Sequence, residues 1–145
     1  MDLKGFLQMI AGPGGTIHIR TQSVVDDSIQ EYWLKPDEYE PESLEEAFGE
    51  KSLTEQRNMW FQVSTVNDHS KTPVGANVVW ADIDLYKYPG GEQQAMGLMR
   101  YLPTPSVVVR SGRGLHVYWK LKETVSAAGP MSAAQILAKS AQWFL

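Results

Sequence analysis

The sequence predicts a sheet-rich α/β (α+β) domain, and three observations lead to that class. Segments 16–21 and 30–34 alternate polar and apolar residues as strands do, and they are close enough in sequence to pair as a hairpin. An apolar run at 78–85 has the composition of a central strand. A helical pattern over 91–101 separates that run from β-branched residues at 106–109.

The chain of 145 residues suits one domain with a useful core. The apolar run within residues 1–10 is too short and too interrupted for a signal peptide or a membrane span. The sequence has no cysteine, so nothing indicates an oxidising compartment. These features predict a cytoplasmic protein. Residues 11–15 are glycine-rich and form a loop or turn before the first strand.

The segment after the hairpin is strongly acidic. From 26 to 55 there are eleven acidic residues against two basic ones. Ser43 is placed to cap a short helix within this segment, which is otherwise a surface loop. A strand over 59–66 and a polar loop over 67–72 then lead to the apolar run at 78–85.

Asp82 and Asp84 are the first candidate functional residues. Because side chains alternate along a strand, they share one face, while Ala81, Ile83 and Leu85 take the other. Two like charges on a buried strand repel each other unless a cation lies between them, and oxygen ligands favour Mg²⁺ or Mn²⁺ over zinc. The pair therefore predicts a divalent-metal site. The alternative is an ordinary edge strand that ends in water.

A glycine-rich turn after the strand at 106–109 is the second candidate site. Its four residues are Ser111, Gly112, Arg113 and Gly114. The two glycines permit positive φ and leave backbone N–H groups open to an anion, and Arg113 adds charge. His116 follows on the next strand, on the same face as Tyr118, where it can contact the same anion. Together these residues predict a phosphate site, although a turn or a histidine of this kind alone is more often structural.

The helix over 91–101 is expected to place Met96, Leu98 and Met99 on or near its inner face. Residues 132–145 form a second apolar helical pattern with no stop signal. That pattern predicts that the chain is cut within a longer protein or is a short relative of one.

The order of elements after residue 73 is strand, helix, strand, strand, helix, which matches an RRM-like core. We therefore expect residues 1–73 to form a strand-rich N-terminal αβ unit and residues 74–145 to form part of the RRM-like core. The sequence contains no internal repeat.

The net charge of −4 hides an uneven distribution. Residues 100–122 carry five basic residues and no acidic one, so the positive charge gathers around the predicted phosphate site. The alternative is that these charges are solvated strand ends. Binding of nucleic acid to a protein of this charge is expected to depend strongly on salt.

Other residues are weaker candidates. Arg110 precedes the turn, where it can pair with an aspartate or touch a nucleotide, or lie at the surface. Lys71 and His69 lie in the loop before the aspartate strand and can reach a phosphate, or be solvated. His18 is expected to be structural. The five tryptophans are expected in the core, unless one is exposed and stacks on a base.

Two of these motifs resemble those of a known family. The aspartate strand, a helix and then Pro-Ser-Val-Val-Val-Arg-Ser-Gly-Arg-Gly-Leu-His-Val-Tyr-Trp at 105–119 are similar to the archaeo-eukaryotic primase superfamily. The similarity is greatest to the primase-polymerases of phages, plasmids and other mobile elements. It covers residues 60–122, and the second motif is its specific part.

The resemblance implies a DNA primase/polymerase, a nucleotidyltransferase that adds NTPs or dNTPs on a single-stranded DNA template during replication. A primer and a helicase domain or protein are the further partners that it implies, and no membrane is involved. It assigns Asp82 and Asp84 to two catalytic Mg²⁺ or Mn²⁺ ions, and His116 to the catalytic site. The nucleotide-binding residues would be Ser111, Gly112, Arg113, Gly114 and His116, with Arg110 and Lys71 as additional candidates.

The family has a third motif with another metal-binding aspartate, and this chain departs from it. After His116 the only acidic residue is Glu123, which lies close to the turn and is expected to be solvated. The third ligand of the family pattern is therefore expected beyond Leu145 or is missing.

Two other functions stay open. A rolling-circle replication endonuclease shares the RRM-like fold, but it needs a His-x-His pair and a tyrosine nucleophile, and His116-Val117-Tyr118 offers one histidine. A non-catalytic nucleotide-binding or single-strand-binding module would keep the turn without the third carboxylate.

Overall fold

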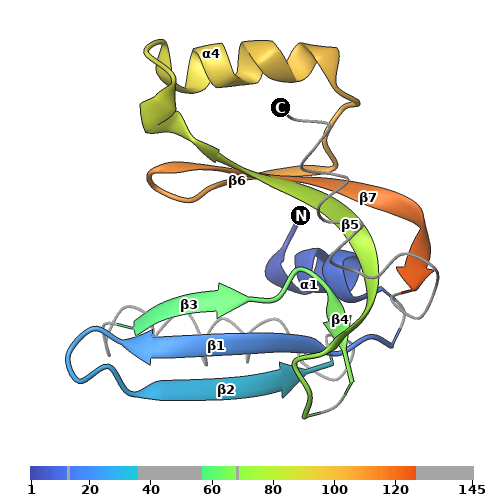
Figure 1. The fold of residues 1–145 in the computed structure, drawn as a ribbon. Coiled ribbons are helices and arrows are strands. Elements are labelled where there is room, and N and C mark those ends of the chain that lie inside the picture. The colour runs from blue at the N-terminus through green and yellow to red at the C-terminus, as the bar shows by residue number, and fades with distance from the viewer. Residues whose placement is uncertain (13, 36–56, 68, 127–145) are drawn as a thin grey trace.

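The computed structural model describes residues 1–12, 14–35, 57–67 and 69–126. Over these residues the protein has two antiparallel sheets and two α-helices (Figure 1). The predicted mixed α+β class is confirmed at this level. One helix lies between the two sheets, and the other lies across the far side of the second sheet (Figure 1).

The first sheet contains the predicted hairpin. Its strand order is β2-β1-β3, with β1 at Ile17–Ser23, β2 at Ile29–Leu34 and β3 at Arg57–Phe61. β1 pairs with both neighbours, and Ile17 lies opposite Leu34 at the end of the hairpin ladder. β1 is therefore the central strand of this sheet, and the predicted hairpin with β2 is confirmed.

The second sheet carries the candidate site. Its strand order is β4-β5-β7-β6. The bounds are Thr65–Val66 for β4, Pro73–Asp84 for β5, Val107–Arg110 for β6 and Gly114–Ser126 for β7. β5 and β7 are the longest strands and pair along most of their length (Figure 1).

The single strand predicted over 59–66 is wrong, because the chain passes from one sheet to the other within it. β3 ends at Phe61, and β4 begins at Thr65 in the second sheet. The Val66 N–H donates to the Thr16 carbonyl at 3.0 Å, and the Thr65 hydroxyl donates to the Gly75 carbonyl at 3.2 Å. The chain thus leaves the first sheet at Phe61 and pairs with Thr16, just before β1, and with β5 of the second sheet, although no glycine or proline interrupts the sequence there.

A helix that the sequence patterns above do not predict, α1, spans Leu3–Ala11. Asp2 caps it, because its Oδ1 accepts a hydrogen bond from the Gly5 N–H at 2.7 Å. Leu7 and Ile10 are three residues apart, so they lie on one side of the helix, and both are buried.

The main hydrophobic core forms where α1 meets both sheets. Its buried members are Leu7, Met9, Ile10 and Ala11 from α1, Ile17, Ile19 and Leu34 from the first sheet, and Val78 and Tyr118 from the second. The Phe6 ring makes edge-to-face contacts with Phe61 at 5.6 Å and with Tyr118 at 5.2 Å between ring centroids. Phe6 thus connects the two sheets directly.

The predicted helix over 91–101 is confirmed as α4, Gly91–Leu98, followed by a 3₁₀ turn, η3, Met99–Tyr101. Its predicted inner face is partly wrong. Met99 is buried, but Met96 and Leu98 are 41% and 51% exposed. Ala95 and Met99 are four residues apart and define the side that faces the sheet, so Met96 and Leu98 point away from it.

The order β5, α4, β6, β7 agrees with the predicted strand, helix, strand, strand. Between α4 and this sheet lies a second hydrophobic core, whose buried members are Met99, from η3, and Leu115 and Val117 of β7. The short helix capped by Ser43 and the helix over 132–145 lie outside the described residues, so they stay predictions.

A large bulge interrupts the β5–β7 ladder. Ala76 pairs with Val125 and Val78 pairs with Lys120, so the β7 residues 121–124 lie opposite Asn77 alone. Asn77 is buried and donates from Nδ2 to the Ile10 carbonyl at 3.1 Å. Its Oδ1 accepts a hydrogen bond from the Thr124 hydroxyl. The Asn77 side-chain amide therefore connects the bulge to the end of α1, and both its nitrogen and its oxygen have hydrogen-bond partners.

The contacts of Phe6 lead to a prediction about stability. Phe6→Ala should lower the free energy of unfolding by about 2 kcal/mol, because a partly buried ring that touches both sheets is lost. Phe6→Leu keeps most of the apolar volume and should cost about 1 kcal/mol. Urea denaturation of both variants measures the difference. A Phe6→Ala protein as stable as the wild type would show that the Phe6 ring does not help to hold the sheets together.

Candidate functional site

The β5–β7 ladder brings the two sequence motifs together. Asp82 lies opposite His116 and Asp84 lies opposite Gly114. The His116 Nε2 atom is 3.6 Å from Asp82 Oδ1. The ladder thus brings the two aspartates, His116 and the glycine-rich turn to one corner of the second sheet.

The two faces of β5 differ as predicted. Ile83 and Leu85 pack against the second core. The carboxylates are on the opposite face, which α1 covers only in part: Val78 and Tyr118 are buried under the helix, whereas the Asp82 side chain is 52% exposed. The expectation that the carboxylates lie on a buried strand is therefore wrong, since water reaches this end of the face.

Trp80 and Tyr118 form the boundary between the core and the exposed corner. The Trp80 ring lies edge-on to His116, with 6.2 Å between ring centroids. Burial, with a smaller contribution from the charge of Asp82, raises the pKa of the Tyr118 hydroxyl to about 12. Tyr118 is therefore neutral and inaccessible at physiological pH.

The turn from Ser111 to Gly114 uses its two glycines for different reasons. Gly112 has φ +85°, in the left-handed region that favours glycine. Gly114 does not; a Cβ atom there would lie 2.5 Å from the Ile83 carbonyl oxygen, so glycine is needed for the close approach of β5 and β7. The expectation of positive φ at both glycines is right only for Gly112.

Backbone hydrogen bonds hold the turn against β5. The Ser111 N–H donates to the Gly114 carbonyl at 3.0 Å, and the Leu85 N–H donates to the Arg113 carbonyl at 3.3 Å. Ser111, Gly112 and Arg113 are exposed. The turn therefore presents its backbone and the Arg113 side chain to solvent beside the two aspartates.

Lys87 also belongs to this corner, and the sequence patterns did not indicate it. A 3₁₀ turn, η2, spans Leu85–Lys87 and brings the Lys87 Nζ atom to 2.7 Å from Asp84 Oδ2. The hydrogen bond and the charge of Asp84 raise the pKa of Lys87. The Nζ atom also lies 5.6 Å from the centre of the exposed Tyr86 ring. The three-residue spacing to Asp84 was the available signal.

Arg110 pairs with Glu92 and not with Asp82 or Asp84. It lies opposite Leu115 on β6, on the side of the sheet that faces α4. Its Nη2 atom donates to Glu92 Oε1 at 2.7 Å, and its Nε atom is 3.2 Å from both carboxylate oxygens. This pairing lowers the pKa of Glu92. Arg110 thus connects β6 to the first turn of α4.

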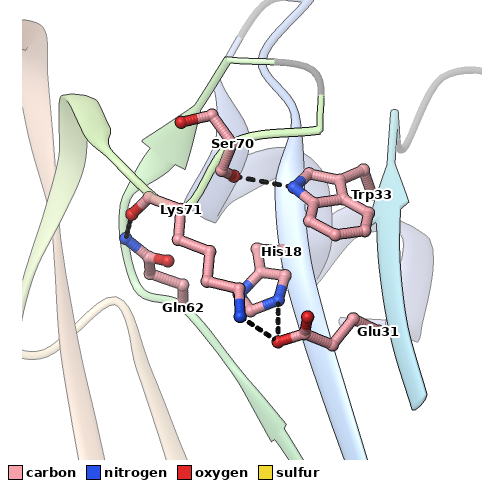
Figure 2. Close-up of polar contacts among 6 residues, drawn as sticks. All are labelled: His18, Glu31, Trp33, Gln62, Ser70 and Lys71. Atoms are coloured by element: carbon pink, nitrogen blue, oxygen red, sulfur yellow. Dashed lines mark hydrogen bonds and ion pairs between the residues drawn. The ribbon is translucent and has the colours of Figure 1, made fainter.

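Lys71 lies in a separate cluster on the first sheet (Figure 2). Its Nζ atom is 2.5 Å from Glu31 Oε1, and His18 Nε2 is 3.3 Å from the same oxygen. The Trp33 Nε1–H donates to the Ser70 carbonyl at 2.7 Å. These contacts fasten the loop before β5, so the structure gives Lys71 and His18 structural partners and does not bring them to Asp82.

His69 and Trp119 contact residues other than the two aspartates, and Trp60 is exposed. The His69 ring lies 5.5 Å from Trp33. Trp119 donates from Nε1 to the Pro103 carbonyl at 2.7 Å and packs against the second core, whereas Trp60 is 49% exposed on β3. Trp143 lies outside the described residues.

The donor chemistry at the corner fits a hard divalent ion in part. Asp82 and Asp84 supply carboxylate oxygens of the kind that Mg²⁺ and Mn²⁺ prefer. Within the described ranges, however, no three or more His, Asp or Glu side chains converge as a metal site. Two carboxylates are fewer ligands than such an ion requires, so further oxygen donors would be needed.

Comparison with models of protein families, with curated proteins and with solved structures finds no match for this chain. In the part of the chain that the structure describes, no helix is both long and apolar enough to cross a membrane.

The different roles of the two glycines can be separated by substitution. Gly114→Ala should destabilise the protein by about 2 kcal/mol or more, because its Cβ would meet the backbone of β5. Gly112→Ala has open space around it and should cost about 1 kcal/mol, from the left-handed backbone alone. Thermal or urea unfolding tests the order. Equal stability of the two variants would contradict the assigned roles.

The pair formed by Arg110 and Glu92 predicts a pH dependence. Because the pKa of Glu92 is lowered in the folded protein, the pair stabilises the fold above the ordinary carboxyl pKa and loses this effect as pH falls through the lowered value. Arg110→Met should raise the pKa of Glu92 toward its ordinary range, which carboxyl-detected NMR measures. Arg100→Met removes an equivalent exposed charge and should leave Glu92 unchanged. An unchanged Glu92 pKa in Arg110→Met would show that the pair does not form.

Proposed function

We propose that this chain contributes the metal- and nucleotide-binding site of a DNA primase-polymerase similar to the archaeo-eukaryotic primase superfamily. One observation carries the proposal: Asp82 is paired with His116, and Asp84 with Gly114, across adjacent strands. The two motifs that resemble the family thus lie at one corner, with carboxylates for cations and a bare turn for phosphates.

The topology supports the same proposal. β7 lies between β5 and β6, and α4 connects those two strands, which is the split β-α-β arrangement expected of an RRM-like core. The segment up to residue 73 supplies α1 and the first sheet, as expected of an N-terminal αβ unit. Both parts share the core around α1, so we treat them as one catalytic unit.

In the proposed reaction, the primer 3′-oxygen forms a bond to the α-phosphorus of the incoming nucleotide, and the bond to the β-phosphate oxygen breaks to release pyrophosphate. Bound Mg²⁺ or Mn²⁺ would acidify the 3′-hydroxyl and neutralise the leaving group. Asp82 and Asp84 would hold the cations. The turn N–H groups other than that of Ser111, which donates to Gly114, would hold the triphosphate together with Arg113, and His116 would contact a phosphate or orient Asp82 from across the ladder.

The rolling-circle alternative is less well supported. It needs two histidines at one metal, but the rings of His18 and His69 both lie near Trp33 of the first sheet, whereas His116 is on the second. Its tyrosine nucleophile would have to be accessible, and Tyr118 is 1% exposed with a raised pKa.

A nucleotide-binding module without turnover is the second candidate. It is favoured by the lack of a third converging carboxylate among the described residues. The two candidates share the same binding site, so primer extension on a single-stranded template distinguishes them.

The binding site is tested by calorimetric titration of a nucleoside triphosphate with and without Mn²⁺. The wild type should bind in a metal-dependent way, and Asp82→Asn and His116→Ala should each lose that binding by about tenfold or more. Glu123→Gln, an exposed carboxylate change on β7, is the matched control and should bind normally. Unchanged metal-dependent binding by Asp82→Asn would refute the assignment.

A further inference from the structure

Lys87 contacts the proposed site, and the proposed reaction gives it no role. Its Nζ atom lies 2.7 Å from Asp84 Oδ2 and 5.6 Å from the centre of the Tyr86 ring. The Lys87 side chain is 61% exposed and the Asp84 side chain is 39% exposed. The ammonium group therefore has both a carboxylate partner and free access to solvent.

The backbone around Lys87 is well fixed. η2 begins directly after β5, and the Leu85 N–H donates to the Arg113 carbonyl in the glycine-rich turn. The Leu85 side chain packs against the second core, and the Tyr88 N–H closes the 3₁₀ turn on the Leu85 carbonyl at 3.0 Å. Lys87 thus projects from a rigid support that is bonded directly to the proposed phosphate-binding turn.

An ammonium group and a divalent cation compete for the same carboxylate oxygen. A cation that binds Asp84 Oδ2 displaces the Lys87 ammonium, because two cations close to one oxygen repel each other. The displaced ammonium stays within reach of the site on its four-carbon stem, and the Tyr86 ring offers a weaker contact for it. A triphosphate bound beside Asp84 would be a stronger partner for that ammonium than water.

On this basis, and resting on the proposed function, we infer that Lys87 is a phosphate-binding residue that exchanges partners. In the ligand-free protein it neutralises Asp84. When a divalent cation takes Asp84, Lys87 transfers to the phosphates of the incoming nucleotide. The exchange keeps the corner electrically balanced in both states and couples metal binding to triphosphate binding.

The alternative role for Lys87 is a surface ion pair of the i,i+3 type, which would contribute little to stability and nothing to ligand binding. The two roles differ in measurable ways. Exchange predicts opposite changes in two affinities when the ammonium is removed: metal alone binds more tightly, and metal with triphosphate binds more weakly.

The test is calorimetric titration of Lys87→Met with Mn²⁺ alone, and then with ATP and dATP at saturating Mn²⁺. We expect Mn²⁺ alone to bind about threefold more tightly than to the wild type, since a competing cation is gone. We expect the triphosphates to bind about tenfold more weakly. Lys122→Met removes the same charge from an exposed site on β7 and should change neither affinity. Equal denaturation midpoints for all three proteins show that the fold is intact.

The outcomes separate this inference from the proposed function. If the wild type binds triphosphate with Mn²⁺ but Lys87→Met binds it equally well, the role of Lys87 is refuted and the site stands. Tighter Mn²⁺ binding without weaker triphosphate binding also refutes the phosphate contact and leaves Lys87 as a counter-ion only. If the wild type shows no metal-dependent binding, the proposed function fails, and the inference fails with it.

Discussion

The antiparallel pairing of β5 with β7 is the constraint on which the rest of the structure depends. It sets Asp82 against His116, and it also decides which side chains of the two strands face α1 and which face α4. A shift of one residue would exchange these faces and would place the carboxylates under α4. Both the fold and the site therefore depend on the register of β5 against β7. The close approach of the two strands at Gly114 helps to set that register.

One face of this ladder serves two purposes along its length. Under α1 it carries Val78 and Tyr118, which are buried in the main core. Further along the same face, Asp82 and His116 are only partly covered. The helix covers the apolar part of the face and leaves its polar end open, so the site is supported by the core without lying inside it. Phe6 and Asn77 connect the helix to this sheet, through the Tyr118 ring and the Ile10 carbonyl.

The sequence was sufficient for elements whose signal is local. The hairpin of β1 and β2, the aspartate strand and α4 follow from periodic patterns, and the face shared by Asp82 and Asp84 follows from alternation alone. The helix α1 was also detectable, because Asp2 provides a cap before an apolar pattern. Distant partners were not detectable: nothing near Arg110 indicates Glu92, and nothing near Lys71 indicates Glu31. The passage of the chain out of the first sheet after Phe61 was not detectable either, because it depends on hydrogen bonds to the distant residues Thr16 and Gly75.

The pairing of β5 with β7 also has a consequence for how the chain folds. Segment 85–113, with α4 and β6, lies between the two strands and must be brought round before their ladder can form. Closing such a loop costs entropy before any contact is gained, so this step is slow compared with closing the hairpin of β1 and β2. Asp82 and His116 meet only when that step is complete. The site therefore exists only in a chain that has already formed this non-local ladder.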